Sequence, residues 1–200
     1  MVNVKQPVCM LIGQAAAGTL AALAVDTGLK PAEVPVRDVQ QALLDFDAYL
    51  LHYLDVNPDS KFFKAIQKIG ATGILRGEGK NAGWENQTLF YPDSLLSRTA
   101  LQTGLNDIAP ELSLDSKDQV LTGGEALAII QNLMQLGSDE KGNMGRELPL
   151  TEASRIWKKY GMGAFRQHEP MTRAAFCLLL DELADPFTNW PVDHWGNFSF

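Results

Sequence analysis

The chain has 200 residues, of which 46% are hydrophobic and 20% are charged, and its formal net charge is −7. This length and composition are typical of a soluble globular protein with one large or two small domains. The negative charge excludes the basic surface through which proteins bind nucleic acids, and it equally excludes a polybasic attachment to a membrane surface.

Residues 13–27 are predicted to form a helix of small side chains, because alanine, which dominates the segment, has the highest helix propensity. Gly28 suits the position after a helix C-terminus, and Pro31 prevents the helix from continuing. Small side chains on every side favour a helix that is fully buried. Glycine and polar residues interrupt the apolar run, which argues against a signal peptide and against a membrane span.

A second helix is expected over residues 36–54, because its apolar residues recur every three or four positions. The polar segment 55–60, with one proline and two aspartates, is typical of a linker. We therefore expect two domains, one covering residues 1–55 and the other residues 56–200.

The second domain carries a weak internal repeat. After a helix at 61–75, three helices are predicted to start behind the hydroxyl N-caps Ser97, Thr122 and Thr172, and Glu125 completes a capping box with Thr122. The third and seventh residues after each helix start are apolar, which predicts a shared core: Leu101, Leu105, Ala126, Ile130, Phe176 and Leu180. With a further helix at 151–160, the expected fold is mostly α, with pseudo-three-fold symmetry in this module.

Residues that usually carry chemistry form no recognisable set. The three histidines stand alone, no G-x-S-x-G or C-x-x-C motif occurs, and Gly77–Ala82 is interpreted as a turn rather than a nucleotide-binding loop. Cys9 and Cys177 are expected to be buried free thiols, and the tryptophans are expected in cores rather than on a carbohydrate platform. No catalytic residue and no metal site is predicted.

The N-terminal stretch QPVCMLIGQAAAGT, residues 6–19, resembles the last flavin-contacting segment of bacterial FAD-dependent oxidoreductases, in which C-M-x-x-G-Q-A-A-G-T opens a helix. The likeness extends through residues 29–31 and 39–44. It implies that Gly13, Gln14 and Ala15 contact FAD, with the helix N-terminus offering free N–H groups and a partial positive charge. This sequence has one alanine more than the pattern, at 15–17.

The rest of the flavin machinery is missing from the sequence, since no G-x-G-x-x-G turn follows a strand near the start. We therefore expect the C-terminal fragment of a larger oxidoreductase, with Met1 lying inside the parent chain and Phe200 at its natural end. FAD is expected in the full-length parent and not in this fragment, which is not catalytic alone. Its partner would be the missing N-terminal flavin domain of the same chain.

The second domain resembles S-layer homology repeats through residues 63–66, 73–74, 90–92, 96–98 and 170–174. Such repeats pack three-fold and bind cell-wall polysaccharide with an arginine at the capped helix start, which implies Arg98 and Arg173 as ligand-binding residues. Gly123 replaces the middle arginine. The alternatives are therefore a glycan-binding module or a pure interaction domain, and the family resemblance implies a periplasmic or extracellular location.

Overall fold

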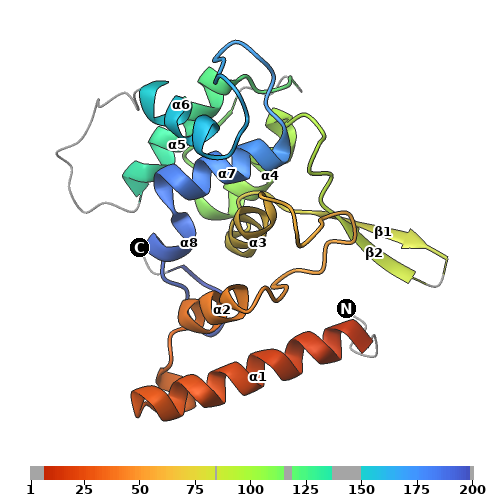
Figure 1. Cartoon of the computed structure of the whole chain (residues 1–200), viewed down its shortest axis with the longest axis vertical. Coiled ribbons are helices and arrows are strands. Elements are labelled where there is room, and N and C mark those ends of the chain that lie inside the picture. Colours follow the sequence, from red (N-terminus) through yellow and green to blue (C-terminus); the bar gives the residue numbers. More distant parts are fainter. Residues whose placement is uncertain (1–6, 84, 115–118, 137–149, 199–200) are drawn as a thin grey trace. The chain divides into compact units, whose positions relative to one another are not determined.

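The computed structural model describes residues 7–83, 85–114, 119–136 and 150–198. The described chain is mostly helical, with one two-stranded sheet, as the sequence predicted (Figure 1). It divides into two compact units. Unit 1 contains the described residues up to 52 together with 191–198, and unit 2 contains residues 53–190.

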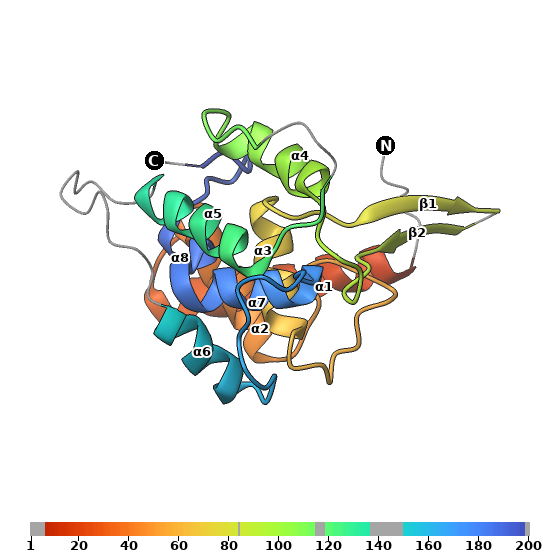
Figure 2. The same cartoon turned by 90° about the horizontal axis from the view of Figure 1, so that it is seen from above.

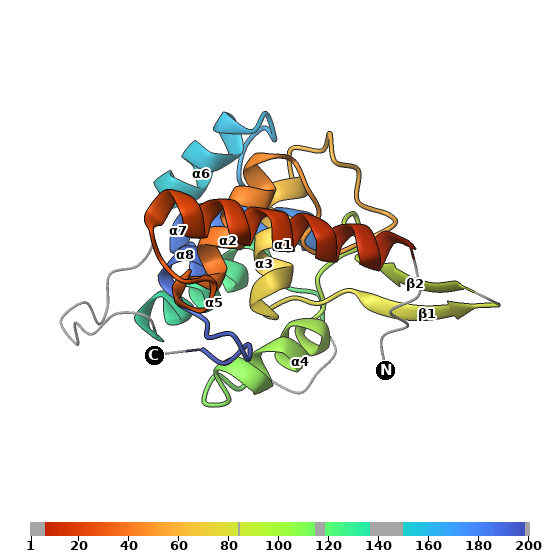
Figure 3. The ribbon, with the colours of Figure 1, turned by 90° about the horizontal axis from the view of Figure 1, so that it is seen from below.

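Unit 1 is built on two helices joined by a short turn. Helix α1 spans Pro7–Thr27, the 3-10 helix η1 spans Pro31–Glu33, and helix α2 spans Val36–Asp45. Gly28 follows α1 with φ 70°, in the left-handed region that glycine adopts without strain. Helix α1 runs without a kink over its whole length (Figure 3).

Each helix of unit 1 has one end that differs from the prediction: the start of α1 and the end of α2. Helix α1 begins at Pro7, six residues before Gly13, so it includes the apolar residues that precede the alanine run. Helix α2 ends at Asp45 instead of continuing to residue 54. Asp47 adopts a left-handed φ of 55°, and the N–H of Ala48 returns to the carbonyl of Leu43, which closes the helix.

Unit 2 holds the remaining elements. Helix α3, Phe63–Thr72, packs against α7, Arg173–Ala184, and against the short α8, Pro186–Asn189. Helices α4, Arg98–Ile108, α5, Gly123–Leu136, and α6, Leu150–Lys159, complete the module, and α5 and α6 both contact α7. Cys177 of α7 is a buried free thiol, as predicted, and burial strongly raises its pKa.

A hairpin stands where the sequence predicted a turn. Strand β1, Glu78–Ala82, pairs antiparallel with β2, Glu85–Leu89, with Glu78 opposite Leu89. The hairpin projects from the helices of unit 2 (Figure 2). Its strands lack the alternating apolar residues that identify a half-buried strand, so hydrophobic periodicity gave no signal. Its base is fixed by tertiary contacts, among them the bond from the N–H of Leu54 to the carbonyl of Thr88.

Three short extended segments form a closed ring at the centre of unit 2. The N–H of Leu96 donates to the carbonyl of Met171, that of Met171 to Leu121, and that of Leu121 back to Leu96, at 2.8–2.9 Å. Two residues further on, a second cycle runs in the opposite sense: the N–H groups of Arg98, Gly123 and Arg173 donate to the carbonyls of Gln119, Glu169 and Ser94, respectively. Each segment thus pairs with both others, which is the predicted pseudo-three-fold arrangement.

The three capped helices leave this ring as predicted. Ser97 accepts a hydrogen bond from the N–H of Ala100, and Thr172 accepts one from the N–H of Ala175. Thr122 and Glu125 form the reciprocal capping box. The residues three and seven positions after the first residue of each helix are all fully buried, which confirms the predicted core: Leu101, Leu105, Ala126, Ile130, Phe176 and Leu180.

Candidate functional site

One side of α1 is apolar, uncharged and exposed. No charged residue occurs in the helix before Asp26. Leu11 is 65% exposed and Val25 is 81% exposed, and Gly13, Gln14 and Ala15 are exposed as well. The expectation that this helix is buried on every side is therefore wrong for the described chain, because only α2 and η1 are recorded against it within unit 1.

Within the described part of the chain, no packing contact explains the two glycines of α1. A Cβ added at Gly13 or at Gly18 would meet nothing within 4 Å. Glycine in a helix interior costs about 0.5–1 kcal/mol relative to alanine, because it loses more conformational freedom on folding. These positions are therefore open for the close approach of another group to the helix backbone.

The predicted position of Gly13 at a helix N-terminus is wrong. Gly13 is the seventh residue of α1, and the free N–H groups of a helix belong to its first turn, here residues 7–10. Gly13, Gln14 and Ala15 instead occupy the side of the second and third turns. Contact with a planar ligand there depends on the missing Cβ of Gly13 and on the side-chain amide of Gln14, which offers both a donor and an acceptor.

An apolar groove of about 360 Å³ lies between α1 and α2. Ile12, Ala16 and Leu20 line it from α1, and Val39 and Leu43 line it from α2. The polar groups at this groove are those of Gln40, Tyr49 and His194.

Arg98 begins α4 in unit 2 and lies beside an open polar groove of about 440 Å³, which Thr99, Gln102, Thr103 and Asn106 also line. Its guanidinium forms an ion pair with Glu125 of α5. The N–H of Thr122 holds the pKa of the Glu125 carboxyl below its usual range, with Arg98 contributing. Arg98 is therefore partly committed to a contact between two repeats.

The other predicted ligand-binding arginine does not face solvent. Arg173 is 5% exposed, its Nε donates to the carbonyl of Phe90 at 2.7 Å, and its Nη2 donates to that of Arg76 at 2.7 Å. The guanidinium also lies 4.8 Å from the ring centroid of Phe90, and burial lowers its pKa. Arg173 thus holds the hairpin base to α7, because its donors are used by main-chain acceptors. Its buried guanidinium therefore does not present a pair of N–H donors to a ligand in solvent.

Gly123 occupies the position in the middle repeat that is equivalent to Arg98 and Arg173, and its surroundings explain the glycine. A Cβ at Gly123 would come within 2.9 Å of the Phe165 ring and 3.1 Å of the Arg166 carbonyl oxygen. An arginine side chain has no room at that place. Structural packing therefore explains the residue that breaks the repeat pattern.

The sequence also made predictions about metal sites, membrane spans and tryptophans. Among the described residues no group of His, Cys, Asp or Glu is arranged to hold a metal ion. Nor does any described helix have the length and apolar character to cross a membrane. Trp190 is buried as expected, whereas Trp195 is 90% exposed, and Trp84 lies outside the described residues. The expected core position is therefore wrong for Trp195.

Residues 5–43 match the model of a family described as FAD dependent oxidoreductase. No curated protein and no solved structure matches the chain. The match covers α1, η1 and most of α2, which are the helical elements of unit 1, and none of unit 2. The N-terminal part of this chain is thus similar to a segment of FAD-dependent oxidoreductases, and the match covers less than half of the chain.

Proposed function

We propose that this chain is the C-terminal part of an FAD-dependent oxidoreductase, in which α1 forms one wall of the flavin site. Gly13, Gln14 and Ala15 would contact the flavin, and the nucleotide-binding part of the same protein would supply the remaining contacts. Unit 2 would be an accessory helical module. The 200 residues would not act as an enzyme by themselves.

The observation that carries this proposal is that α1 has two exposed glycines, Gly13 and Gly18, at which an added Cβ would meet nothing among the described residues. A helix that is uncharged up to Asp26 and carries exposed apolar residues and glycines costs stability unless something covers it. The family match falls on this helix and not on unit 2. Flavin fits such a face, because a ring system packs flat against a backbone that lacks a Cβ, and Gln14 can hydrogen-bond to its polar edge.

The test uses the full-length, FAD-containing protein. Gly13→Val places a branched side chain in the space that the ring would occupy, so we expect FAD to bind at least about tenfold more weakly, or by about 1.4 kcal/mol. Gly79→Val is the matched control, since Gly79 of the hairpin also has nothing within 4 Å of an added Cβ. Equal flavin content in wild type and Gly13→Val would mean that α1 is a packing element only.

The polar groove beside Arg98 supports a second candidate function, the binding of an anionic polysaccharide by unit 2. An arginine presents a planar fork to carboxylate or ketal oxygens, and the amide and hydroxyl side chains of this groove suit sugar hydroxyls. The test is a pull-down with purified cell-wall polymer. Arg98→Ala should reduce retention and the exposed control Arg166→Ala should not. Equal retention by both variants would remove the groove from consideration.

A further inference from the structure

The C-terminal residues 191–198 form a closed loop organised by Asp193. One carboxylate oxygen, Oδ1, accepts the main-chain N–H groups of Trp195 and Asn197 at 2.8 Å each, and Oδ2 accepts the side-chain amide of Asn197 at 3.0 Å. The N–H of Asp193 donates to the carbonyl of Asn197 at 2.9 Å. The side-chain bond from Asn197 is the main reason why the pKa of Asp193 is lowered. The loop is therefore held in one conformation by its own hydrogen bonds.

This loop is joined to the helices of unit 1, although it lies far beyond residue 43, where the family match ends. The Nε2–H of His194 donates to the carbonyl of Ala32 in η1 at 2.9 Å. The guanidinium of Arg37, in the first turn of α2, lies 6.0 Å from the ring centroid of Phe198. His194 also lines the groove between α1 and α2. One loop thus contacts both the turn between the two helices and the second helix.

The turn that His194 contacts begins at a glycine that no side chain packs against among the described residues. Gly28 joins α1 to η1 in the left-handed conformation, and an added Cβ there would meet nothing within 4 Å. The turn itself is closed by the local contact of Glu33 with the main-chain N–H of Lys30, at 2.9 Å. The bond from His194 therefore adds a contact from outside the turn to these local bonds and to the direct packing of α1 against α2.

We propose that His194 is a positioning residue: through Ala32 it fixes the angle between α1 and α2, and so holds the face of α1 with Gln14 and Ala15 in the geometry that flavin requires. The inference rests on the proposed function. In this arrangement unit 2 is an insertion between two parts of the flavin-type unit, and the C-terminal loop is a third element of that unit.

The experiment compares three variants that separate the hydrogen bond from the loop. His194→Leu removes the donor at similar size, and His194→Gln keeps a side-chain N–H. Trp195→Ala changes the 90% exposed neighbour on the same loop. Hydrogen exchange of residues 28–36 is measured in this 200-residue chain, and the dissociation constant of FAD is measured in the full-length protein.

We expect His194→Leu to speed exchange in residues 28–36 and to weaken FAD binding by about three- to tenfold, the effect of one lost hydrogen bond. His194→Gln should recover part of both effects, and Trp195→Ala should change neither. Unchanged exchange in His194→Leu would overturn the inference. Faster exchange without any loss of FAD affinity would also overturn it, because His194 would then be structural only.

The two proposals fail in different ways. If Gly13→Val leaves FAD binding intact while His194→Leu still speeds exchange, the flavin role of α1 is wrong and the tie between His194 and Ala32 is real. If Gly13→Val weakens FAD binding and His194→Leu changes nothing, the flavin role stands and the positioning role is wrong.

Discussion

Arg98 of α4 forms an ion pair with Glu125 of α5, and Glu125 stands in the second repeat where Ala100 and Ala175 stand in the other two. The same carboxylate accepts the N–H of Thr122 at 2.8 Å and its hydroxyl at 2.9 Å. One glutamate therefore caps its own helix and joins it to the neighbouring repeat. The pseudo-three-fold packing thus brings the capping residue Glu125 into contact with Arg98 of the neighbouring repeat.

The equivalence of the three caps predicts similar costs for their removal. Ser97→Ala, Thr122→Ala and Thr172→Ala should each lower the free energy of unfolding by about 1 kcal/mol, because each leaves a first-turn N–H without its acceptor. Thr103→Ala, at an exposed position inside α4, should stay within about 0.5 kcal/mol of wild type. Urea unfolding of the chain is the measurement. A cap variant indistinguishable from Thr103→Ala would show that its helix start is held by packing alone.

Arg173 should matter for stability. Arg173→Met leaves the carbonyl oxygens of Phe90 and Arg76 without their donor, and each unsatisfied buried acceptor costs about 1–3 kcal/mol. We expect a loss of about 2–4 kcal/mol in the free energy of unfolding. Arg166→Met, whose side chain is 69% exposed, should change stability by less than about 0.5 kcal/mol. Equal stabilities of the two variants would contradict the structural role of Arg173.

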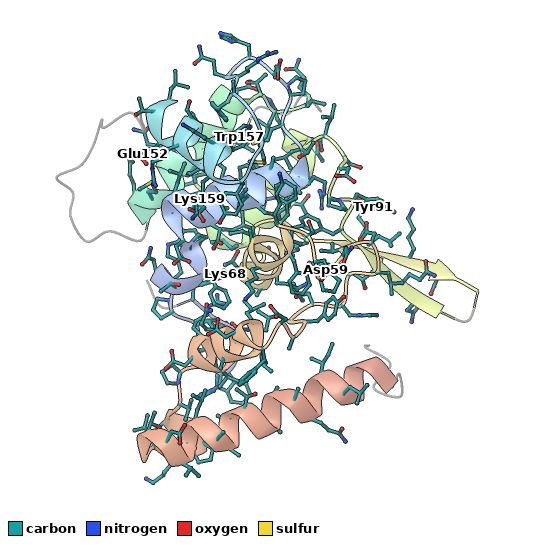
Figure 4. All side chains as sticks on the ribbon, viewed as in Figure 1. Asp59, Lys68, Tyr91, Glu152, Trp157 and Lys159 are labelled. Atoms are coloured by element: carbon teal, nitrogen blue, oxygen red, sulfur yellow. The ribbon has the colours of Figure 1, made fainter. Side chains whose placement is uncertain are left out.

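The carboxyl of Asp181 in α7 predicts a pH dependence. Burial raises its pKa to about 6, against the opposing influence of Lys68, whose ammonium lies 3.4 Å away on α3 (Figure 4). Asp185 and Glu182 are the other charged groups that act on it, and Asp185 raises the pKa further.

Because the folded pKa is above the unfolded one, the folded state binds more protons between about pH 4 and pH 6. The contribution of Asp181 to stability is therefore fully present at low pH and is lost as the pH rises through about 6. Asp181→Asn removes this titration, so its stability relative to wild type should rise by about 2–3 kcal/mol from pH 4 to pH 7. Unfolding curves measured over this pH range provide the check, and a constant difference between the two proteins would refute the shift.

The open space around the glycines of α1 predicts that alanine substitutions there stabilise this chain. Gly13→Ala and Gly18→Ala should each stabilise the helix in this chain by about 0.5–1 kcal/mol, because the added methyl group meets nothing and alanine favours helix. Far-ultraviolet circular dichroism during thermal unfolding measures this gain. Ala21→Gly, at an exposed position of the same helix, should produce a loss of the same size. A destabilising Gly13→Ala would mean that the position is already covered within the chain.

The chain by itself should bind no FAD and should purify without colour. One helix face supplies far less contact than a dinucleotide needs, and the glycine-rich turn that binds the pyrophosphate is absent from these 200 residues. The check is the visible flavin absorbance after incubation with excess FAD and gel filtration. Stoichiometric flavin would contradict the expectation.

The sequence by itself determined the features that depend on neighbours only a few residues away. The hydroxyl caps at 97, 122 and 172 and the apolar residues four and eight positions after them were predicted correctly, because capping and helical periodicity act within one or two turns. The mostly helical fold followed from the same signals. The family likeness of residues 5–43 was likewise visible in the order of a few residues.

Only the tertiary structure decided what each exposed or charged residue does. Arg98 and Arg173 have equivalent places in the repeat, yet one borders an open groove and the other donates to a carbonyl 83 residues away in the chain. The hairpin and the loop around His194 gave no periodic signal, since contacts distant in sequence and a single aspartate hold them. Burial and hydrogen-bond partners depend on segments that meet only after folding. The order of neighbouring residues therefore does not predict them.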